Sequence, residues 1–205
     1  MILVAVTGGI GAGKTTVLSS FSQLGAAIAD ADDIAHDLYL PGRPAYQALR
    51  ERWGEEILNQ DGSICRATVA AKVFSQPQEL AWLNNLIHPL VQQEIVDMAS
   101  TSGKPLFCAI PLLHECAWQQ QMTATVAVWC DAATQHQRLL ARGWSEEEIA
   151  GRLSKQLSMD EKMRRADYMV LTGCPRELTH RQCEAVYGTI LAGHADDDAR
   201  FSIHL

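Results

Sequence analysis

A glycine-rich loop near the start of the chain has the residue types and spacing of a phosphate-binding site. The segment "GGIGAGKTT", residues 8–16, matches the pattern G-x-x-x-x-G-K-[ST] at Gly8, Gly13, Lys14 and Thr15. Glycines let backbone N–H groups converge on phosphate oxygens, and the helix that follows directs its positive end at them. The lysine reaches the outer phosphates, and the threonine hydroxyl is placed to bind Mg²⁺. The pattern predicts nucleotide contacts from these residues: Gly8, Gly11, Ala12, Gly13, Lys14, Thr15 and Thr16.

The segments on either side of the loop have the properties that such a site requires. Residues 2–6 form an apolar run, as expected of a buried strand. Residues 15–24 place apolar side chains on one side of a helix that ends at Gly25. A glycine-rich turn with a surface lysine is the simpler interpretation, but it does not require a strand before the loop and a helix after it. The sequence therefore predicts a P-loop nucleotide-binding protein.

Four aspartates follow within the segment "IADADDIAHD", residues 28–37. The segment overlaps the end of a short apolar run, 26–29, which is expected to be the next strand, and the carboxyl ends of parallel strands line the ligand crevice of such sheets. Asp30 and Asp32 are therefore expected near the terminal phosphate, where a carboxylate can align an attacking hydroxyl or accept its proton. The alternative is that the aspartates cap the start of a helix, which is the role we expect for Asp33.

The composition is that of an ordinary globular protein, with 205 residues of which 47% are apolar and 20% charged. This length is sufficient for one compact domain with a full core. The net charge of −7 argues against sequence-independent binding to nucleic acid, which needs a basic surface. The apolar run at residues 2–6 is too short for a signal sequence or a membrane span, and the six cysteines include no C-x-x-C pair. We therefore expect a cytoplasmic protein with free thiols and no membrane association.

Short apolar runs recur along the chain at intervals typical of a parallel sheet. They are expected to be strands, with helical patterns between them, at residues 2–6, 26–29, 106–110, 125–130 and 168–171. Continuous apolar runs indicate strands covered on both faces, and the alternation of strand and helix indicates an α/β fold. The predicted fold class is a three-layer P-loop NTPase fold with a parallel sheet.

Two insertions are expected within this single domain of residues 1–205. Residues 35–103 contain helical patterns and no convincing strand, which predicts a helical insertion on the sheet. Residues 143–157 are expected to form a small lid, in which Ser145 and Glu148 make a capping box at the start of a helix that runs to about Leu157. The core then comprises residues 1–34, 104–142 and 158–192, and a polar tail, 193–205, is expected to be loosely held.

The segment that starts near residue 125 distinguishes two kinds of P-loop protein. The strand at 125–130 leads to Asp131, which could hold a metal, as in a motor ATPase, or cap the next helix; we favour the cap. Arg138 and Arg142 then precede the lid, so that arginines can neutralise a transferring phosphoryl group while the lid excludes water. The guanine-binding string N-K-x-D and the switch string D-x-x-G do not occur. The sequence favours a small-molecule kinase, and a nucleotide-dependent switch or binding protein is the alternative from another class.

The sequence resembles the dephospho-CoA kinase family over nearly its whole length, to about residue 192. The resemblance lies in the following segments: "VTGGIGAGKTTV" (6–17), "DADDIAH" (30–36), "LIHPLV" (86–91), "IPLLHE" (110–115), "RLSKQ" (152–156) and "RADYMV" (165–170), together with Arg138, Arg142 and Lys162. The phosphate loop combined with D-A-D-x-I-A and I-H-P is far more specific than any of the three alone.

The resemblance implies ATP- and Mg²⁺-dependent phosphorylation of the ribose 3′-hydroxyl of dephospho-CoA. It implies that Asp32 is the base, that Arg138 and Arg142 bind the phosphates of ATP, and that the helical insertion receives the acceptor. Together with the local chemistry it predicts catalytic roles for Lys14, Asp32 and Arg142. The acceptor contacts expected are Asp30, Asp32, His88, Pro89, Leu112 and Glu115. A kinase of another nucleotide-like acceptor is the alternative within the same class. We expect a monomer or a weak homo-oligomer that binds this small molecule.

Two of the acceptor residues have equally good structural interpretations. His88 could cap a helix that is kinked at Pro89. Glu115 could be a surface acid, or it could orient the substrate or a metal-bound water molecule.

The chain departs from the family at three positions. Ala109 stands where Asp is frequent, His114 where an aromatic residue is usual, and Thr172 where Asn is common. The phosphate-transfer residues themselves are present, so an active enzyme is expected.

Overall fold

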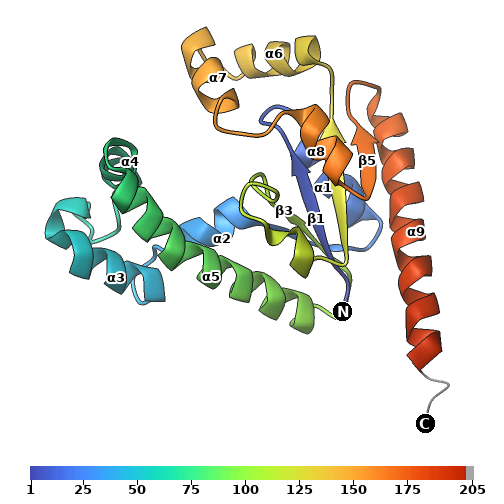
Figure 1. Cartoon of the computed structure of the whole chain (residues 1–205), viewed down its shortest axis with the longest axis horizontal. Helices are drawn as coiled ribbons and strands as arrows, with labels where there is room; N and C mark the ends of the chain where they lie inside the picture. Colours follow the sequence, from blue (N-terminus) through green and yellow to red (C-terminus); the bar gives the residue numbers. More distant parts are fainter. Residues whose placement is uncertain (202–205) are drawn as a thin grey trace. The chain divides into compact units, whose positions relative to one another are not determined.

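The computed structural model describes residues 1–201 of the chain, with side chains as far as residue 193. The described chain forms two compact units (Figure 1). One comprises Met1–Ala29 and the chain from Ala99 onward, and the other comprises Asp30–Met98. The sequence led us to expect a helical insertion over residues 35–103, so the second unit begins and ends a few residues earlier than expected.

The first unit is built on a parallel sheet of five strands in the order β2-β3-β1-β4-β5. Their bounds are β1 (Leu3–Gly8), β2 (Ala27–Asp30), β3 (Leu106–Ala109), β4 (Ala124–Trp129) and β5 (Tyr168–Leu171). Strand β1 pairs in parallel with both β3 and β4, and β4 pairs in parallel with β5. Every predicted strand is confirmed, with ends that shift by at most two residues. All residues of β1 and β3 are buried, which explains their unbroken apolar runs.

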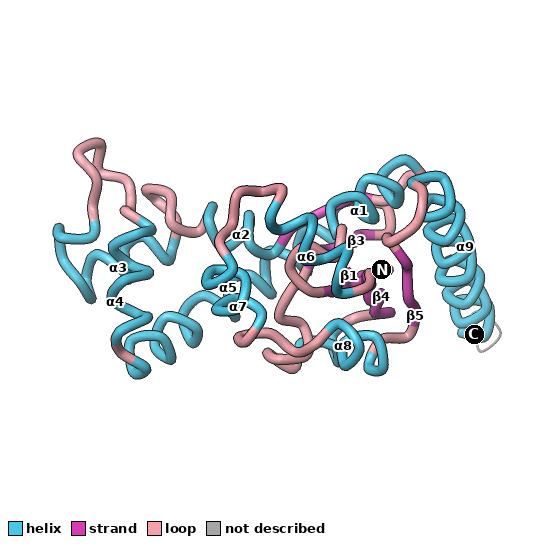
Figure 2. Tube along the Cα trace, turned by 90° about the horizontal axis from the view of Figure 1, so that it is seen from above, coloured by secondary structure: helices cyan, strands magenta, loops and turns pink. Residues whose placement is uncertain are grey.

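Helices cover the sheet on both faces and complete the three layers. Their bounds in this unit are α1 (Lys14–Gln23), α6 (Ala132–Leu140), α7 (Glu146–Leu153), α8 (Met159–Arg165) and α9 (Arg176–Phe201). Helix α1 lies on one side of the sheet and α8 on the other (Figure 2). On the side of α1, the Phe21 ring stacks on Phe107 of β3 at 4.1 Å, and Tyr187 of α9 lies 6.4 Å from Phe21. The predicted three-layer α/β fold is therefore confirmed.

The C-terminal boundary differs from the one expected from sequence. We placed a loosely held tail at residues 193–205, whereas α9 continues to Phe201. Residues 202–205 lie outside the described part of the chain.

The predicted lid helix is confirmed at its start and ends early. The Ser145 hydroxyl accepts a hydrogen bond from the Glu148 N–H at 3.2 Å, and the Glu148 carboxylate accepts one from the Ser145 N–H at 2.9 Å. Helix α7 ends at Leu153, so the residues up to Leu157 form a link to α8 instead of a continued helix. Within this lid the Arg152 guanidinium lies 4.3 Å above the ring of Trp144.

The second unit is helical, as expected. It holds α2 (Ala31–Asp37), α3 (Pro44–Trp53), α4 (Arg66–Ser75) and most of α5 (Pro77–Thr101). Throughout residues 30–98, all of which the structure describes, the pairing after β2 is limited to an isolated antiparallel bridge between Leu58 and Ile64. Each of these helices contributes buried apolar residues to this unit, among them Ala31 of α2, Leu49 of α3, Val73 of α4 and Ile87 of α5.

Pro89 lies inside α5 and does not end it. His88 therefore occupies a helix interior, and the interpretation of His88 as a helix cap is wrong. The physical reason is that a helix tolerates proline when its neighbouring turns are held by packing, as Ile87 and Val91 are here. Among residues 1–201, no helix combines the length and apolar character needed to cross a membrane.

Candidate active site

The phosphate loop joins the end of β1 to the first residue of α1, and its glycines allow close contact with neighbouring strands. Gly13 precedes α1 with φ 95°, in the left-handed region that favours glycine. A Cβ atom on Gly13 would lie 3.1 Å from the Thr172 hydroxyl, and one on Gly8 would lie 2.7 Å from the Val128 carbonyl oxygen. The loop therefore packs against Val128 of β4 and against Thr172, which leaves no room for side chains at these two positions.

The start of α1 has the properties of an anion site. Among the described residues no side chain caps this helix end, and its first turn carries no acidic residue, so they leave the partial positive charge of the helix unneutralised. Lys14 folds back over the loop, and its Nζ donates to the carbonyl oxygens of Gly8 at 2.8 Å and Gly9 at 3.2 Å. Thr15 is exposed in the first turn. The loop, the lysine and the helix end together suit the phosphates of a nucleotide.

The side chains of Arg138 and Thr172 form a brace for the phosphate loop through hydrogen bonds to its carbonyl oxygens. The Arg138 guanidinium donates to the carbonyl oxygens of Gly11 and Ala12 at 3.4 Å each, to the Thr172 hydroxyl at 3.1 Å and to the Thr172 carbonyl oxygen. The Thr172 hydroxyl itself donates to the Ala12 carbonyl oxygen. The sequence suggested that Arg138 binds ATP phosphates; in the structure its hydrogen bonds go to the loop backbone and to Thr172.

A pocket of about 200 Å³ opens beside this brace. It is lined by Gly11, Gly13, Thr16, Arg138, Arg142, Thr172, Cys174, Arg176 and Thr179. Three arginines and the loop backbone surround it, which makes it suitable for part of an anionic ligand. Arg142, beyond the end of α6, is exposed, unlike Arg138.

Of the aspartates at the end of β2, one caps the next helix and the two that follow it are exposed. Asp30 ends β2 and caps α2, because its carboxylate accepts a hydrogen bond from the Asp32 N–H at 2.9 Å. Asp32 and Asp33 follow in the first turn of α2, and both are exposed. Capping, the alternative considered from the sequence, is thus what Asp30 does. The same is true of Asp131, which caps α6 by accepting from the Thr134 N–H at 2.8 Å, so the preference for a cap over a metal ligand is supported.

A sequence profile described as Dephospho-CoA kinase matches residues 2–174. The chain belongs to the dephospho-CoA kinase family. It is 36% identical to a dephospho-CoA kinase from Symbiobacterium thermophilum over 97% of this chain and 85% of that protein. The crystal structure of TT1252 from Thermus thermophilus is similar at a TM-score of 0.80 and 29% identity, over 92% of this chain and 97% of the other.

The fold has further relatives among solved kinases. A dephospho-CoA kinase from Campylobacter jejuni superimposes with a TM-score of 0.68 at 22% identity, over 94% of this chain and 98% of that one. This likeness supports the P-loop kinase fold. As a member of the family, the chain is a phosphotransferase with a nucleotide-binding P-loop.

Glu115, expected to contact substrate or to be a surface acid, lies at the surface but is held there by hydrogen bonds to Lys162 and Leu157. Its side chain is 19% exposed, and its two oxygens accept hydrogen bonds from Lys162 Nζ at 2.7 and 3.0 Å. The Leu157 N–H donates to the same carboxylate at 2.8 Å. Burial alone raises the pKa of the Glu115 carboxyl, but these hydrogen bonds outweigh burial and hold the pKa below its usual value. Leu112, on the same loop after β3, is exposed.

Two histidines lie in environments that favour their neutral form. His88 is half-buried in α5, and burial lowers its pKa. Pro89 beside it is exposed. His114 is buried, and burial, followed by the charge of Lys162, lowers its pKa. Within the described residues, the Nε2 atom of His114 has no hydrogen-bond partner.

Two glutamines hold the tip of the phosphate loop, and the sequence did not assign a role to either. Gln135 of α6 donates to the Ile10 carbonyl oxygen at 2.7 Å, and Gln156, after the lid helix, accepts from the Ile10 N–H at 3.3 Å. Gln156 occurs in the family segment "RLSKQ", which was a usable signal. Gln135 lies in a segment without a motif, and the contact depends on how α6 crosses the loop.

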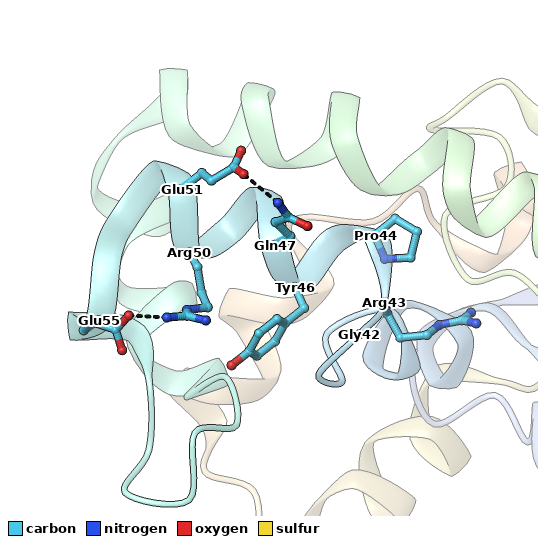
Figure 3. A pocket seen from close by; sticks show the side chains of 8 residues that line it. All are labelled: Gly42, Arg43, Pro44, Tyr46, Gln47, Arg50, Glu51 and Glu55. Atoms are coloured by element: carbon cyan, nitrogen blue, oxygen red, sulfur yellow. Dashed lines mark hydrogen bonds and ion pairs between the residues drawn. The ribbon is translucent and has the colours of Figure 1, made fainter.

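The second unit has a pocket of its own, of about 600 Å³, beside α3. It is lined by Gly42, Arg43, Pro44, Tyr46, Gln47, Arg50, Glu51 and Glu55 (Figure 3). Arg50 pairs with Glu55, and Gln47 donates to Glu51 at 3.0 Å. The Tyr46 hydroxyl donates to the Gly62 carbonyl oxygen at 2.7 Å. The pocket is therefore polar, and the charge of Arg50 is already balanced within it.

Proposed function

We propose that this chain transfers the γ-phosphoryl group of ATP to the ribose 3′-hydroxyl of dephospho-CoA, giving CoA and ADP, the last step of CoA synthesis. The observation that carries the proposal is the phosphate loop: an uncapped helix start beside a pocket with three arginines, in a chain of this family. The loss of an acceptor-side acid should then slow transfer strongly and leave nucleotide binding intact.

The nucleotide side of the reaction is assigned to the first unit. Backbone N–H groups of the loop and Lys14 hold the phosphates, and Arg142 neutralises charge on the transferring group. Arg138 keeps the loop in shape by binding its carbonyl oxygens. The Thr15 hydroxyl, together with phosphate oxygens, would hold Mg²⁺, which supplies further charge neutralisation when bound.

The acceptor side is assigned to the second unit and to the loop after β3. Asp32 orients the 3′-hydroxyl and takes its proton, while Asp30 fixes the first turn of α2 that carries Asp32. His88, Pro89 and Leu112 are proposed acceptor contacts. The pocket beside α3 suits an uncharged, amide-bearing part of the acceptor better than its phosphates, because Arg50 there already has an acidic partner.

The test is ADP release by the purified protein with Mg-ATP, with and without dephospho-CoA. Asp32→Asn should lower acceptor-dependent turnover by about 100-fold, the usual scale for a lost general base, and leave ATP binding intact. Asp33→Asn is the matched control, because Asp33 is the exposed neighbour of Asp32 in the same helical turn. It should keep turnover close to wild type.

Two outcomes would overturn the proposal. ADP release that ignores the acceptor would favour the nucleotide-dependent switch. Faster turnover with a nucleoside monophosphate than with dephospho-CoA would favour a kinase of another acceptor.

We further propose that the protein acts in the cytoplasm, as a monomer or a weak homo-oligomer. The absence of disulfides among its six cysteines, all of them described, is compatible with a reducing compartment. Light scattering on the purified protein at several concentrations tests the oligomeric state.

A further inference from the structure

A fully buried lysine contacts the loop that follows β3. Lys162 of α8 has a side-chain exposure of 0%, and its Nζ donates to the Pro111 carbonyl oxygen and to both oxygens of Glu115. The Thr7 hydroxyl, at the end of β1, donates to the same Pro111 oxygen at 3.4 Å. Lys162 therefore joins α8 to the loop after β3, and through Pro111 to the strand that leads into the phosphate loop.

The same network reaches the end of the lid. Glu115, held by Lys162, accepts the Leu157 N–H at 2.8 Å. The preceding residue, Gln156, accepts the Ile10 N–H at the tip of the phosphate loop at 3.3 Å. Two consecutive residues after α7 are thus attached to two different parts of the site. The link between α7 and α8 has a fixed position because of these two contacts.

A buried lysine is costly unless its charge is paired and hydrogen-bonded, and an apolar side chain of similar size often stabilises a fold better. Lys162 is fully enclosed, and its amino group donates directed hydrogen bonds to the Pro111 carbonyl oxygen and to the Glu115 carboxylate. Directed bonds specify geometry, whereas apolar packing specifies it less strictly. Here the directed bonds fix the position of the link between α7 and α8, which is the end of the lid.

We infer that Glu115 and Lys162 are positioning residues that hold the end of the lid, at Gln156 and Leu157, against the phosphate loop. Neither needs to touch the reacting atoms. By fixing one end of the lid they set where Arg152 of α7 lies when the lid closes on bound nucleotide. This inference rests on the proposed function for its effect on phosphoryl transfer, but not for its effect on the link itself.

The variant Lys162→Met keeps the length of the side chain and removes its charge and donors. In hydrogen exchange, amides of residues 154–158 should exchange about tenfold faster or more, because the bond to Leu157 is no longer held. Acceptor-dependent kcat should fall by about 100-fold, as expected when positioning is lost by roughly an ångström. The KM for ATP should change by no more than about threefold, since the loop contacts persist.

Two further variants separate positioning from general destabilisation. Glu115→Gln keeps an oxygen that can accept from Lys162 and from the Leu157 N–H but leaves the buried ammonium without its carboxylate partner, so kcat should fall, by less than in Lys162→Met. The double variant Lys162→Met/Glu115→Gln should recover part of the activity lost in Lys162→Met, because no unpaired carboxylate is left behind. Glu161→Gln is the matched control: Glu161 lies on the same helix and pairs with the exposed Arg164 and Arg165. It should leave exchange and kcat unchanged.

The inference is overturned if folded Lys162→Met shows wild-type protection at residues 154–158 together with wild-type kcat. It is also overturned if kcat, KM and amide protection throughout the chain deteriorate together, because that indicates general destabilisation. Should wild-type protein show no transfer to dephospho-CoA, the proposed function fails. The positioning role of Glu115 and Lys162 is then decided by amide exchange at residues 154–158 and by binding of a non-hydrolysable ATP analogue, which Lys162→Met should leave intact.

Discussion

The hydroxyl of Thr172 is the side-chain group whose removal should most directly loosen the phosphate loop. It donates to the Ala12 carbonyl oxygen and accepts from Arg138 at 3.1 Å, and the residue is 4% exposed. The variant Thr172→Val keeps the branched shape and removes this hydroxyl. After the change, Arg138 still donates to the Thr172 carbonyl oxygen, because that bond involves the backbone.

The expected cost follows from the groups that lose a partner. A buried carbonyl left unsatisfied costs about 1–3 kcal/mol. The Ala12 oxygen keeps a long contact to Arg138, at 3.4 Å, which offsets part of this loss. We therefore expect Thr172→Val to lower the free energy of unfolding by about 2 kcal/mol. For a chain of this size, that corresponds to a fall in Tm of about 4–8 °C.

The assay combines urea unfolding, followed by circular dichroism, with binding of a non-hydrolysable ATP analogue. Binding should weaken together with stability, because the hydroxyl lies against Gly13 at the start of α1. Thr189→Val is the matched control, since the Thr189 hydroxyl bonds within the exposed surface of α9. That variant should stay within about 0.5 kcal/mol of wild type.

The reasoning is refuted if Thr172→Val is as stable as Thr189→Val and binds the analogue equally well. Such a result would mean that Arg138 alone keeps the loop in place. Loss of stability with unchanged binding would refute the link between Thr172 and the nucleotide site.

Two further changes test other buried or capping groups. His114→Phe should stabilise the protein by about 1 kcal/mol at neutral pH, because it removes a buried Nε2 without a partner among the described residues. Since the pKa of His114 is lowered in the fold from 6.5, the unfolded chain binds the proton first as pH falls. Wild type then loses stability below about pH 6.5, and the advantage of His114→Phe in chemical unfolding should widen. Asp131→Ala removes the cap of α6 and should lower Tm by about 2–4 °C in a thermal scan at pH 7, whereas a metal-binding role would leave Tm unchanged without metal.

The strands were predictable because a strand that is buried on both faces has a continuous apolar sequence. Residues of β1 and β3 have no exposed face, so every position is apolar or small, and the run is visible without knowledge of its neighbours. The phosphate loop was predictable for a similar reason, because its glycines and Lys14 act through local backbone geometry.

Side-chain partners distant in sequence were not predictable. Arg138 lies within α6 as the pattern suggested, but its guanidinium turns to the carbonyl oxygens of Gly11 and Ala12, 127 and 126 residues away. Glu115 left the alternatives of substrate contact and surface acid open, because its partner Lys162 comes 47 residues later. The capping role of Asp30 was among the sequence alternatives, and the choice needed the extended backbone of Asp30 (φ −129°, ψ 122°), from which its carboxylate accepts the Asp32 N–H.

By itself, the sequence determined the fold class, the phosphate loop, the helical character of the insertion expected at residues 35–103, and the family. These properties depend on periodicity and on motifs of contiguous residues, which are local. The tertiary structure alone decided the strand order β2-β3-β1-β4-β5, the brace formed by Arg138 and Thr172, and the burial of Lys162 beside Glu115. Each of these joins segments far apart along the chain, and their pairing is selected by the packing of the whole sheet and its helices, which no single segment encodes.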